Sequence, residues 1–379
     1  MTVVAALLID GHPVVIADML ITGEQGAMFE GVRLPSSGPV SNLPPSKNPP
    51  IELLQKIVVL AENCVVAFAT TDVYLRCRVA INALRRYAAE GPLTIVGFNQ
   101  FLLDRGPLFN HVALVGWLVE KSGNEKLIAH RINHRGIQII DANLGEIDAA
   151  GTGVSHLQNA GIFAPTNDDR WAGYSFVRRI VAKAFSLCSN LMREEHASGD
   201  PIVKGASGGG YEIATYINGS FGRVAPVTFV VWDAEVFGSE IGLSPPLLVM
   251  KQSTAGPYVT VNSVRLDAEN HPKQLFYKGL LIVAPPLYKV EPLSDFELPE
   301  AFDLHSDMTF HSIYVAKEGS SPCLLSFGTL GRGEGVLGIE SVGDQPRFRR
   351  PLALMNLITS IIAQEFGLPR QDVTLKSLG

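Results

Sequence analysis

The first twenty residues, MTVVAALLIDGHPVVIADML (1–20), contain the pattern that decides the fold. Two runs rich in Val, Ile and Leu, Thr2 to Ile9 and Pro13 to Ala17, flank the pair Asp10-Gly11. An Asp-Gly pair between two such runs is a strong hairpin signal, because both central residues of a tight primed turn need a positive φ. The stretch therefore predicts an antiparallel hairpin that begins at Thr2 and ends at Asp18.

Thr2 is a candidate nucleophile. Methionine is normally removed when a small residue follows it, so we expect the mature chain to begin at Thr2. A free N-terminal threonine combines a hydroxyl nucleophile with an α-amine that takes its proton, and the pKa of that amine is near ~8. The predicted hairpin brings the Asp18 carboxylate close to Thr2. Threonine is common at this position and aspartate is an ordinary turn residue, so the pair carries more weight than either residue.

A cation beside the amine would lower the pKa of the amine and keep it basic. Arg33 and Lys56 are the two options. Arg33 lies within residues 30–50, a stretch rich in Pro, Ser and Gly that predicts a long exposed loop. Lys56 begins a predicted strand, and an ammonium is a better point charge than a guanidinium. We therefore favour Lys56, and Arg33 remains the alternative.

Composition limits the possible classes of protein. The chain has 379 residues, of which 46% are hydrophobic and 18% charged, so it can build a full core. Its net charge of −6 argues against nucleic acid as the main partner. The four cysteines show no CxxC spacing and are interpreted as buried thiols. We find no signal peptide and no apolar run that spans a bilayer, so we expect a cytoplasmic protein without a membrane partner.

The rest of the chain alternates strands and helices. Near Ser244 the pattern changes to short strands broken by proline-rich turns, which indicates a second module. The predicted class is α+β. The main predicted strands are the pairs 56–61 with 64–70 and 111–120 with 126–132, and YEIATYI (211–217) joined to VTFVVWD (227–233) across Asn218-Gly219. The main predicted helices lie at about 71–90, 171–196 and 351–366, and the first has an apolar stripe that contains Cys77 and Leu84.

The order of these segments is informative. The hairpin, KIVVLAENCVVAFATTD, a helix, AAGTGVSHLQ and a long helix ending in EEHASGD follow one another along the chain. Together they resemble a proteasome β-type subunit, one branch of the N-terminal-nucleophile (Ntn) hydrolases, over residues 2–235. The resemblance implies a four-layer αββα sandwich, with two stacked antiparallel sheets between helix layers, for residues 1–240. Residues 241–379 form an appended mixed β/α module without a counterpart in the ordinary family.

The resemblance also implies an activity and a site. The activity is hydrolysis of a peptide or small amide by the N-terminal threonine, without a cofactor or a metal, in a homo-oligomer. Backbone N–H groups near Thr70 are expected to stabilise the oxyanion. The side chains carried over as catalytic are Thr2 as nucleophile, Asp18 and Lys56 as its charged pair, and Thr152, Glu195 and Ser198 around the threonine amine.

The chain departs from the family pattern at several positions. Met19 and Leu20 follow Asp18 where the family has a small polar residue and an arginine, and Thr70 replaces a glycine. These departures favour a first alternative, an assembly subunit that kept the fold and lost the chemistry.

A second alternative is a serine hydrolase. Ser207 lies in GASGG, which fits the G-x-S-x-G nucleophile elbow. The elbow needs a helix after the serine, and a strand-like segment follows here, so we interpret GASGG as a glycine-rich turn.

Overall fold

The structure is a computed structural model in which part of the chain is described. The described residues are 2–22, 33–35, 38–39, 50–70, 74–122, 126–162, 174–197, 207–266, 277–289, 304, 306, 308–330, 337–342, 345–369 and 374–377.

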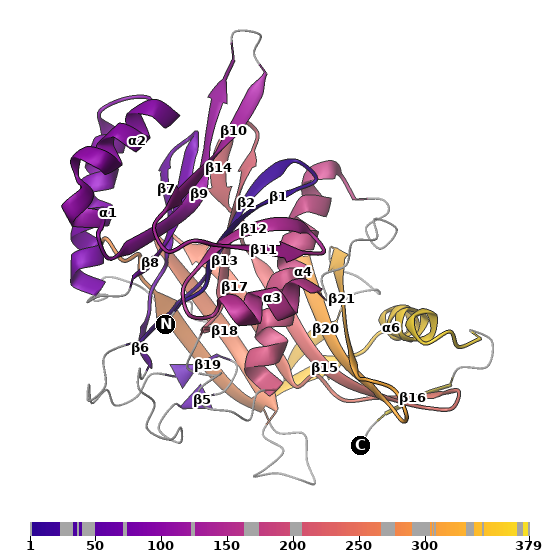
Figure 1. Ribbon diagram of the computed structural model, residues 1–379. Coiled ribbons are helices and arrows are strands. Elements are labelled where there is room, and N and C mark those ends of the chain that lie inside the picture. Colours follow the sequence, from indigo (N-terminus) through magenta and orange to yellow (C-terminus); the bar gives the residue numbers. More distant parts are fainter. Residues whose placement is uncertain are drawn as a thin grey trace.

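β1 and β2 are the two central strands of a six-stranded antiparallel sheet, with the strand order β11-β12-β1-β2-β13-β14 (Figure 1). At the β1–β2 turn, Asp10 and Gly11 have φ values of 50° and 78°, which confirms the predicted hairpin. The strands are β1 (Val4–Ile9), β2 (His12–Asp18), β11 (Gln138–Ala142), β12 (Gly145–Ala150), β13 (Tyr211–Ile217) and β14 (Ser220–Arg223).

A four-stranded antiparallel sheet packs against one face of the six-stranded sheet. Val4 and Ala6 of the six-stranded sheet share a buried cluster with Val65 and Ala67 of the four-stranded sheet. Both predicted strand pairs are confirmed here, in the order β10-β9-β8-β7. The strands are β7 (Ile57–Ala61), β8 (Cys64–Thr70), β9 (Val112–Lys121) and β10 (Leu127–His134).

Helices cover the outer faces of these two sheets. α1 (Tyr74–Ala89) and α2 (Ile95–Asp104) bury apolar side chains against the four-stranded sheet. α3 (Val154–Ile162) and α4 (Phe176–Ala197) do the same against the six-stranded sheet. α1 and α4 match predicted helices, although the expected helix starts at 71–73 and 171–173 lie outside the described residues. α2 was not predicted, and its N-cap is Thr94, whose hydroxyl accepts a hydrogen bond from the Gly97 N–H.

An eight-stranded sheet forms most of the second half of the chain. Its pairing is antiparallel except between β15 and β20 and between β16 and β24. α6 (Leu352–Glu365), a predicted helix, packs on its outer face. The strands are β15 (Val227–Phe237), β16 (Glu240–Leu243), β17 (Leu248–Ala255), β18 (Tyr258–Leu266), β19 (Tyr277–Ala284), β20 (Met308–Lys317), β21 (Cys323–Leu330) and β24 (Thr374–Ser377).

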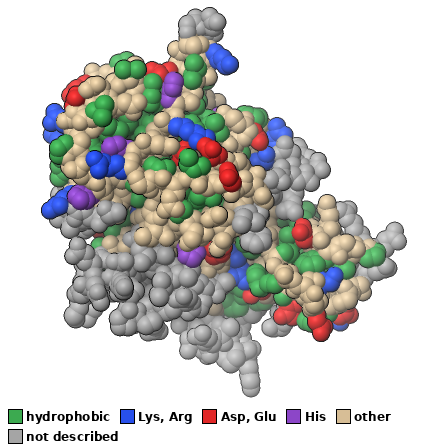
Figure 2. Space-filling model, in the orientation of Figure 1, with side chains coloured by type: hydrophobic (Ala, Val, Ile, Leu, Met, Phe, Trp, Pro, Cys, Tyr) green, Lys and Arg blue, Asp and Glu red, His purple; other side chains and the backbone are tan. Residues whose placement is uncertain are grey.

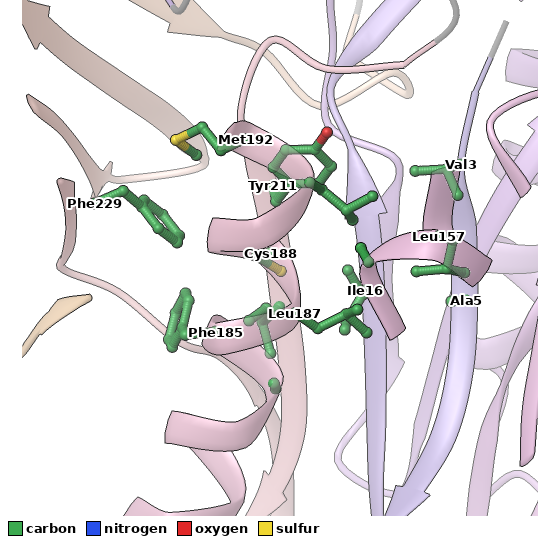
Figure 3. Packing of buried hydrophobic residues seen from close by; sticks show 14 of the residues in the cluster. Val3, Ala5, Ile16, Leu157, Phe185, Leu187, Cys188, Met192, Tyr211 and Phe229 are labelled. Atoms are coloured by element: carbon green, nitrogen blue, oxygen red, sulfur yellow. The ribbon is translucent and has the colours of Figure 1, made fainter. Parts of the chain in front are cut away.

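α4 lies between the six-stranded and eight-stranded sheets (Figure 1). The Phe185 ring lies 5.6 Å from the Phe229 ring and 4.9 Å from the Phe310 ring, both in the eight-stranded sheet. Ile16 and Tyr211 of the six-stranded sheet lie on the other side of the helix (Figure 3). The two halves of the molecule therefore share one hydrophobic cluster through this helix.

Three short two-stranded pairs complete the described strands. They are β3 (Leu20–Thr22) with β6 (Pro50–Leu53), β4 (Arg33–Leu34) with β5 (Gly38–Pro39), and β22 (Gly338–Val342) with β23 (Gln345–Arg349).

Two sequence-based expectations need correction. VTFVVWD was expected beside YEIATYI across the Asn218-Gly219 turn, but β13 pairs there with β14, and VTFVVWD is β15 of the eight-stranded sheet. The expected boundary between residues 240 and 241 thus falls in the β15–β16 hairpin. Residues 30–50 were expected to be an exposed loop, and of these only 33–35, 38–39 and 50 are among the described residues; there Leu34 is buried in the cluster around α4. Its apolar side chain outweighs the polar composition of its neighbours.

The overall class is mixed α+β with mostly antiparallel sheets, as predicted. Acidic and basic side chains lie interspersed on the face shown in Figure 2. Within the described part of the chain, every helix is too short or too polar to cross a bilayer.

Candidate active site

The β1–β2 hairpin places Asp18 beside Thr2. Val4 pairs with Ala17, so Val3 lies opposite Asp18. The Asp18 N–H donates to the Val3 carbonyl at 3.0 Å, and the Val3 N–H donates to Asp18 Oδ1 at 2.9 Å. The carboxylate therefore lies at the peptide that joins Thr2 to the strand, as the sequence predicted.

The other neighbour of Thr2 is the segment that follows β12. The Thr2 N–H donates to Thr152 Oγ1 over a long 3.4 Å, and the Gly153 N–H donates to the Thr2 carbonyl at 3.1 Å. Gly151 has a φ of +104°, and a Cβ at this position would lie 1.9 Å from the Thr2 carbonyl oxygen. Only glycine allows the strand to approach Thr2 this closely. Thr152 is thus brought to the Thr2 nitrogen, as expected.

Lys56 and Asp18 form an ion pair in the interior. Lys56 Nζ lies 2.5 Å from Asp18 Oδ1 and donates to the Leu20 carbonyl at 2.6 Å, and both side chains are at most 1% exposed. Burial lowers the pKa of the Lys56 ammonium, because desolvation penalises the charged form, and the Asp18 carboxylate opposes this shift. The pairing is the one predicted for Lys56.

Glu212, on β13, holds the backbone of Lys56. Its Oε2 accepts from the Lys56 N–H at 2.7 Å and from the Ile57 N–H at 3.2 Å. Arg223 Nε lies 3.4 Å from Glu212 Oε1, and the Arg223 guanidinium also donates to the Ile57 carbonyl at 2.5 Å. Desolvation raises the pKa of Glu212, and Arg223 opposes the rise. Sequence reasoning missed Glu212, because its role depends on strand pairing.

A glycine-rich turn closes the site. The Gly208 N–H donates to Asp18 Oδ2 at 3.0 Å, and the Gly209 N–H donates to Glu195 Oε1 at 3.2 Å. Both glycines have a positive φ, as does Gly210. Glu195 of α4 is buried, and this hydrogen bond joins it to the same turn that binds Asp18.

Ser207 lies in this turn, against Gly153. A Cβ on Gly153, which binds the Thr2 carbonyl, would lie 2.9 Å from the Ser207 Cβ. Ser207 is also hydrogen-bonded to the Tyr211 side chain, whose pKa is raised, chiefly by burial. Ser207 was interpreted from sequence as part of a glycine-rich turn, and the turn is present. Its place at the site follows from the pairing of Tyr211 with Asp18, which no local pattern encodes.

The remaining predicted residues are Ser198, Arg33 and Thr70. Ser198 lies outside the described residues, and of Arg33 only the backbone, in β4, is described. Thr70 ends β8, and its hydroxyl donates to the His111 carbonyl at 3.1 Å. The oxyanion role of the backbone near Thr70 stays a prediction.

The site combines the hydroxyl of Thr2 with the buried ion pair of Lys56 and Asp18. Among the described residues, His, Cys, Asp and Glu side chains form no group of three or more that would hold a metal ion. Thr2 is only 6% exposed, so the hydroxyl and the charged pair lie in a largely desolvated environment.

No protein-family model matches the chain, and no curated protein matches it either.

Proposed function

We propose that the chain is an Ntn hydrolase of the proteasome β-subunit type, which cleaves amide bonds with the hydroxyl of Thr2. The packing of α1 and α2, the four-stranded sheet, the six-stranded sheet, and α3 and α4 supports a four-layer αββα sandwich. The resemblance to the family rests on the residues quoted above.

The buried pair of Lys56 and Asp18 carries the proposal. Burying a lysine and an aspartate is costly, because both charges leave water, and a hydrophobic pair of similar size is often at least as stable. A buried ion pair next to Thr2 is therefore better explained by chemistry than by stability. An ammonium at this position lowers the pKa of the Thr2 amine and favours the deprotonated hydroxyl.

The proposed reaction proceeds in two displacements. After removal of Met1, the Thr2 hydroxyl attacks the amide carbonyl and its proton passes to the Thr2 amine. The amine protonates the departing nitrogen, and an ester links Thr2 to the acyl group. Water then attacks this ester, gives its proton to the amine, and the hydroxyl is restored. In this mechanism Thr152, which accepts a hydrogen bond from the Thr2 nitrogen, orients the amine, and the resemblance assigns Glu195 and Ser198 the same role.

The test combines mass spectrometry with trapping. Intact mass should show that Met1 is absent, because the reaction needs a free amine. A threonine-reactive β-lactone should add once, and peptide mapping should place the adduct on Thr2. Thr2→Ala should abolish both the adduct and the turnover of a fluorogenic peptide amide, whereas Thr2→Ser retains a nucleophile and serves as the matched control.

Two other outcomes would favour one of the alternatives instead of this proposal. Full retention of Met1 without any adduct would indicate the inactive assembly subunit. An adduct on Ser207, together with loss of turnover in Ser207→Ala but not in Thr2→Ala, would indicate the serine hydrolase.

A further inference from the structure

The eight-stranded sheet reaches the candidate site through the side chain of Gln252. Gln252 is on β17 and buried. Its Oε1 accepts from the Tyr211 N–H at 2.7 Å, and its Nε2 donates to the Tyr211 carbonyl at 2.6 Å. One carboxamide thus satisfies both backbone groups of Tyr211, as a neighbouring strand would.

Tyr211 is the residue at which the glycine-rich turn enters β13. The turn packs tightly at this end, because a Cβ on Gly210 would lie 2.6 Å from Gln252 Oε1 and 2.3 Å from the Met19 side chain. The carbonyls of Gly208 and Gly210 both accept from the Met19 N–H, at 3.2 and 3.1 Å. The clamp on Tyr211 therefore acts on the same turn whose Gly208 N–H binds Asp18.

A second carboxamide holds the segment that carries Lys56. Gln55 is 1% exposed, and its Nε2 donates to the carbonyl of Ala284, at the end of β19, at 2.7 Å. The same nitrogen donates to the Pro257 carbonyl, in the β17–β18 turn, at 2.8 Å, and the Gln55 N–H donates to the Pro285 carbonyl at 3.0 Å. The residue next to Lys56 is thus fixed to two points of the eight-stranded sheet.

We propose that Gln252 and Gln55 are positioning residues, through which the C-terminal sheet sets the geometry of Asp18 and Lys56. The catalytic meaning of this inference rests on the function proposed above. It assigns a role to the second module: the module holds the segments that carry Asp18 and Lys56, while the reacting groups lie in the N-terminal half. A site held from two sheets suits chemistry in which a displacement of about 1 Å can cost ~100-fold in rate.

A displaced turn should move Asp18 relative to Lys56 and Thr2. The ionisable groups around Asp18 are Lys56 from the segment before β7, Tyr211 and Glu212 from β13, and Glu195 from α4. The Gly208 N–H binds Oδ2 of Asp18, whose Oδ1 binds Lys56 and the Val3 N–H. Displacement should lower kcat with little effect on KM, because Gln252 binds Tyr211 and acts on the site only through the turn. General destabilisation would leave the kcat of the folded protein in place.

The test compares Gln252→Met with Thr228→Val. Methionine keeps the length of Gln252 and removes both hydrogen bonds. Thr228 is on β15, the strand next to β17. Thr228→Val removes its buried hydrogen bonds to Leu304 and from Ser306 and leaves those between Gln252 and Tyr211 in place, so it controls for general destabilisation. For Gln252→Met we expect kcat to fall roughly 10–100-fold with KM nearly unchanged. For Thr228→Val we expect both constants to be unchanged.

Hydrogen exchange tests the same inference without activity. In Gln252→Met, amides in peptides covering 207–212 should exchange roughly tenfold faster or more, and in Gln55→Met the same should hold for 53–57. Unchanged exchange there, or an equal change in Thr228→Val, would overturn the inference. If exchange changes but Thr2→Ala leaves turnover intact, the clamp stands and the proposed threonine mechanism fails. If Thr2→Ala is inactive while Gln252→Met keeps the wild-type kcat, the mechanism stands and the inference fails.

Discussion

At the scale of single residues, the proposed mechanism gives Lys56 an effect on the amine of Thr2 that is separable from its effect on the stability of Asp18. Its ammonium pairs with Asp18 at 2.5 Å in the interior. Removing one member of a buried ion pair leaves an uncompensated charge and typically costs ~3–5 kcal/mol. A loss of activity in a single variant is therefore ambiguous, because unfolding and loss of the cation give the same result.

A double variant resolves this ambiguity. Lys56→Ala should lower turnover by ~10²–10⁴-fold, the range of general-base effects, and should also lower the free energy of unfolding. Lys56→Met combined with Asp18→Asn removes both charges, so it should recover much of that free energy and remain inactive. Turnover and urea denaturation measure the two quantities. Arg33→Ala is the control and should change little; an inactive Arg33→Ala beside an active Lys56→Ala would transfer the role to Arg33.

His311 gives a second residue-scale prediction, on stability. It is fully buried, accepts a hydrogen bond from Trp232 Nε1 on Nδ1 at 3.1 Å, and stacks on Phe327. Desolvation lowers the pKa of its imidazole to about 3. The unfolded chain binds a proton near pH 6.5 and the folded chain does not, so this contribution is complete above pH 6.5 and is lost as the pH falls towards 3.

The expected loss between pH 7 and pH 5 is about 2 kcal/mol from this one group. His311→Asn keeps an acceptor for the Trp232 N–H and cannot titrate. Denaturant melts of both proteins at both pH values isolate the effect, because the other ionisable groups are common to them. An identical pH dependence in the two proteins would show that His311 is protonated or exposed in the folded state.

At the scale of elements, the turn between α4 and β13 makes a sharp prediction. Gly209 has a φ of +77°, and a Cβ there would lie 2.2 Å from Leu53 Cδ2. Gly219 has a φ of +91° in the β13–β14 turn, with open space around it. Gly219→Ala should cost only backbone strain, about 1–3 kcal/mol. Gly209→Ala should cost more and reduce turnover, because the clash displaces the N–H that binds Glu195.

Thermal melts and turnover of the two glycine variants give the comparison. Equal losses of stability with unchanged turnover in Gly209→Ala would show that the turn does not position the site.

Sequence patterns predicted the elements whose signals are local. Asp10-Gly11 specified the first hairpin, and the apolar stripe that contains Cys77 and Leu84 specified α1. The ion pair of Lys56 and Asp18 was also expected, although it joins two sheets: Asp18 ends β2 of the six-stranded sheet, and Lys56 precedes β7 of the four-stranded sheet. The resemblance implied that pairing, whereas the hairpin and the helix each follow from a short stretch of chain.

The parts that sequence did not predict depend on contacts between distant segments. VTFVVWD reads as a strand, but its partners are β16, β17 and β20, and nothing in its own residues selects them. The same holds for Glu212 and Gln252, which are polar residues in strands and acquire a role only through pairing. Strand register and sheet membership are long-range properties, so local patterns leave them open.

At the scale of the whole molecule, the eight-stranded sheet changes what the resemblance implies for assembly. Proteasome-like subunits stack rings through the faces of their sandwich. Here α4 is buried between two sheets of its own chain, from Ile180 to Arg193. The face on α1 and α2 has exposed Val79, Val96 and Leu103. We therefore expect a homo-oligomer smaller than a stacked ring, and a monomer at all concentrations in sedimentation would contradict this expectation.

The shared cluster around α4 predicts how the chain folds when it is shortened. A cut after residue 240, at the expected domain boundary, keeps β15 but removes β17 and β20, between which β15 lies. It also removes Phe310, which stacks on Phe185, and Gln252, which clamps Tyr211. Apolar surface on α4 and β15 would then face water, at a cost of about 25 cal/mol per Å².

We expect the 1–240 fragment to be insoluble or partly unfolded, and the full chain to unfold with both halves in one transition. A cut after residue 369 is the matched control, because it removes β24. Among the described strands, β24 pairs with β16, and its Thr374 and Lys376 side chains are exposed. That protein should stay folded, with near-wild-type circular dichroism and thermal melting. A soluble, cooperatively folded 1–240 fragment would show instead that the N-terminal half is an independent domain, and that the eight-stranded sheet is an accessory to a self-sufficient site.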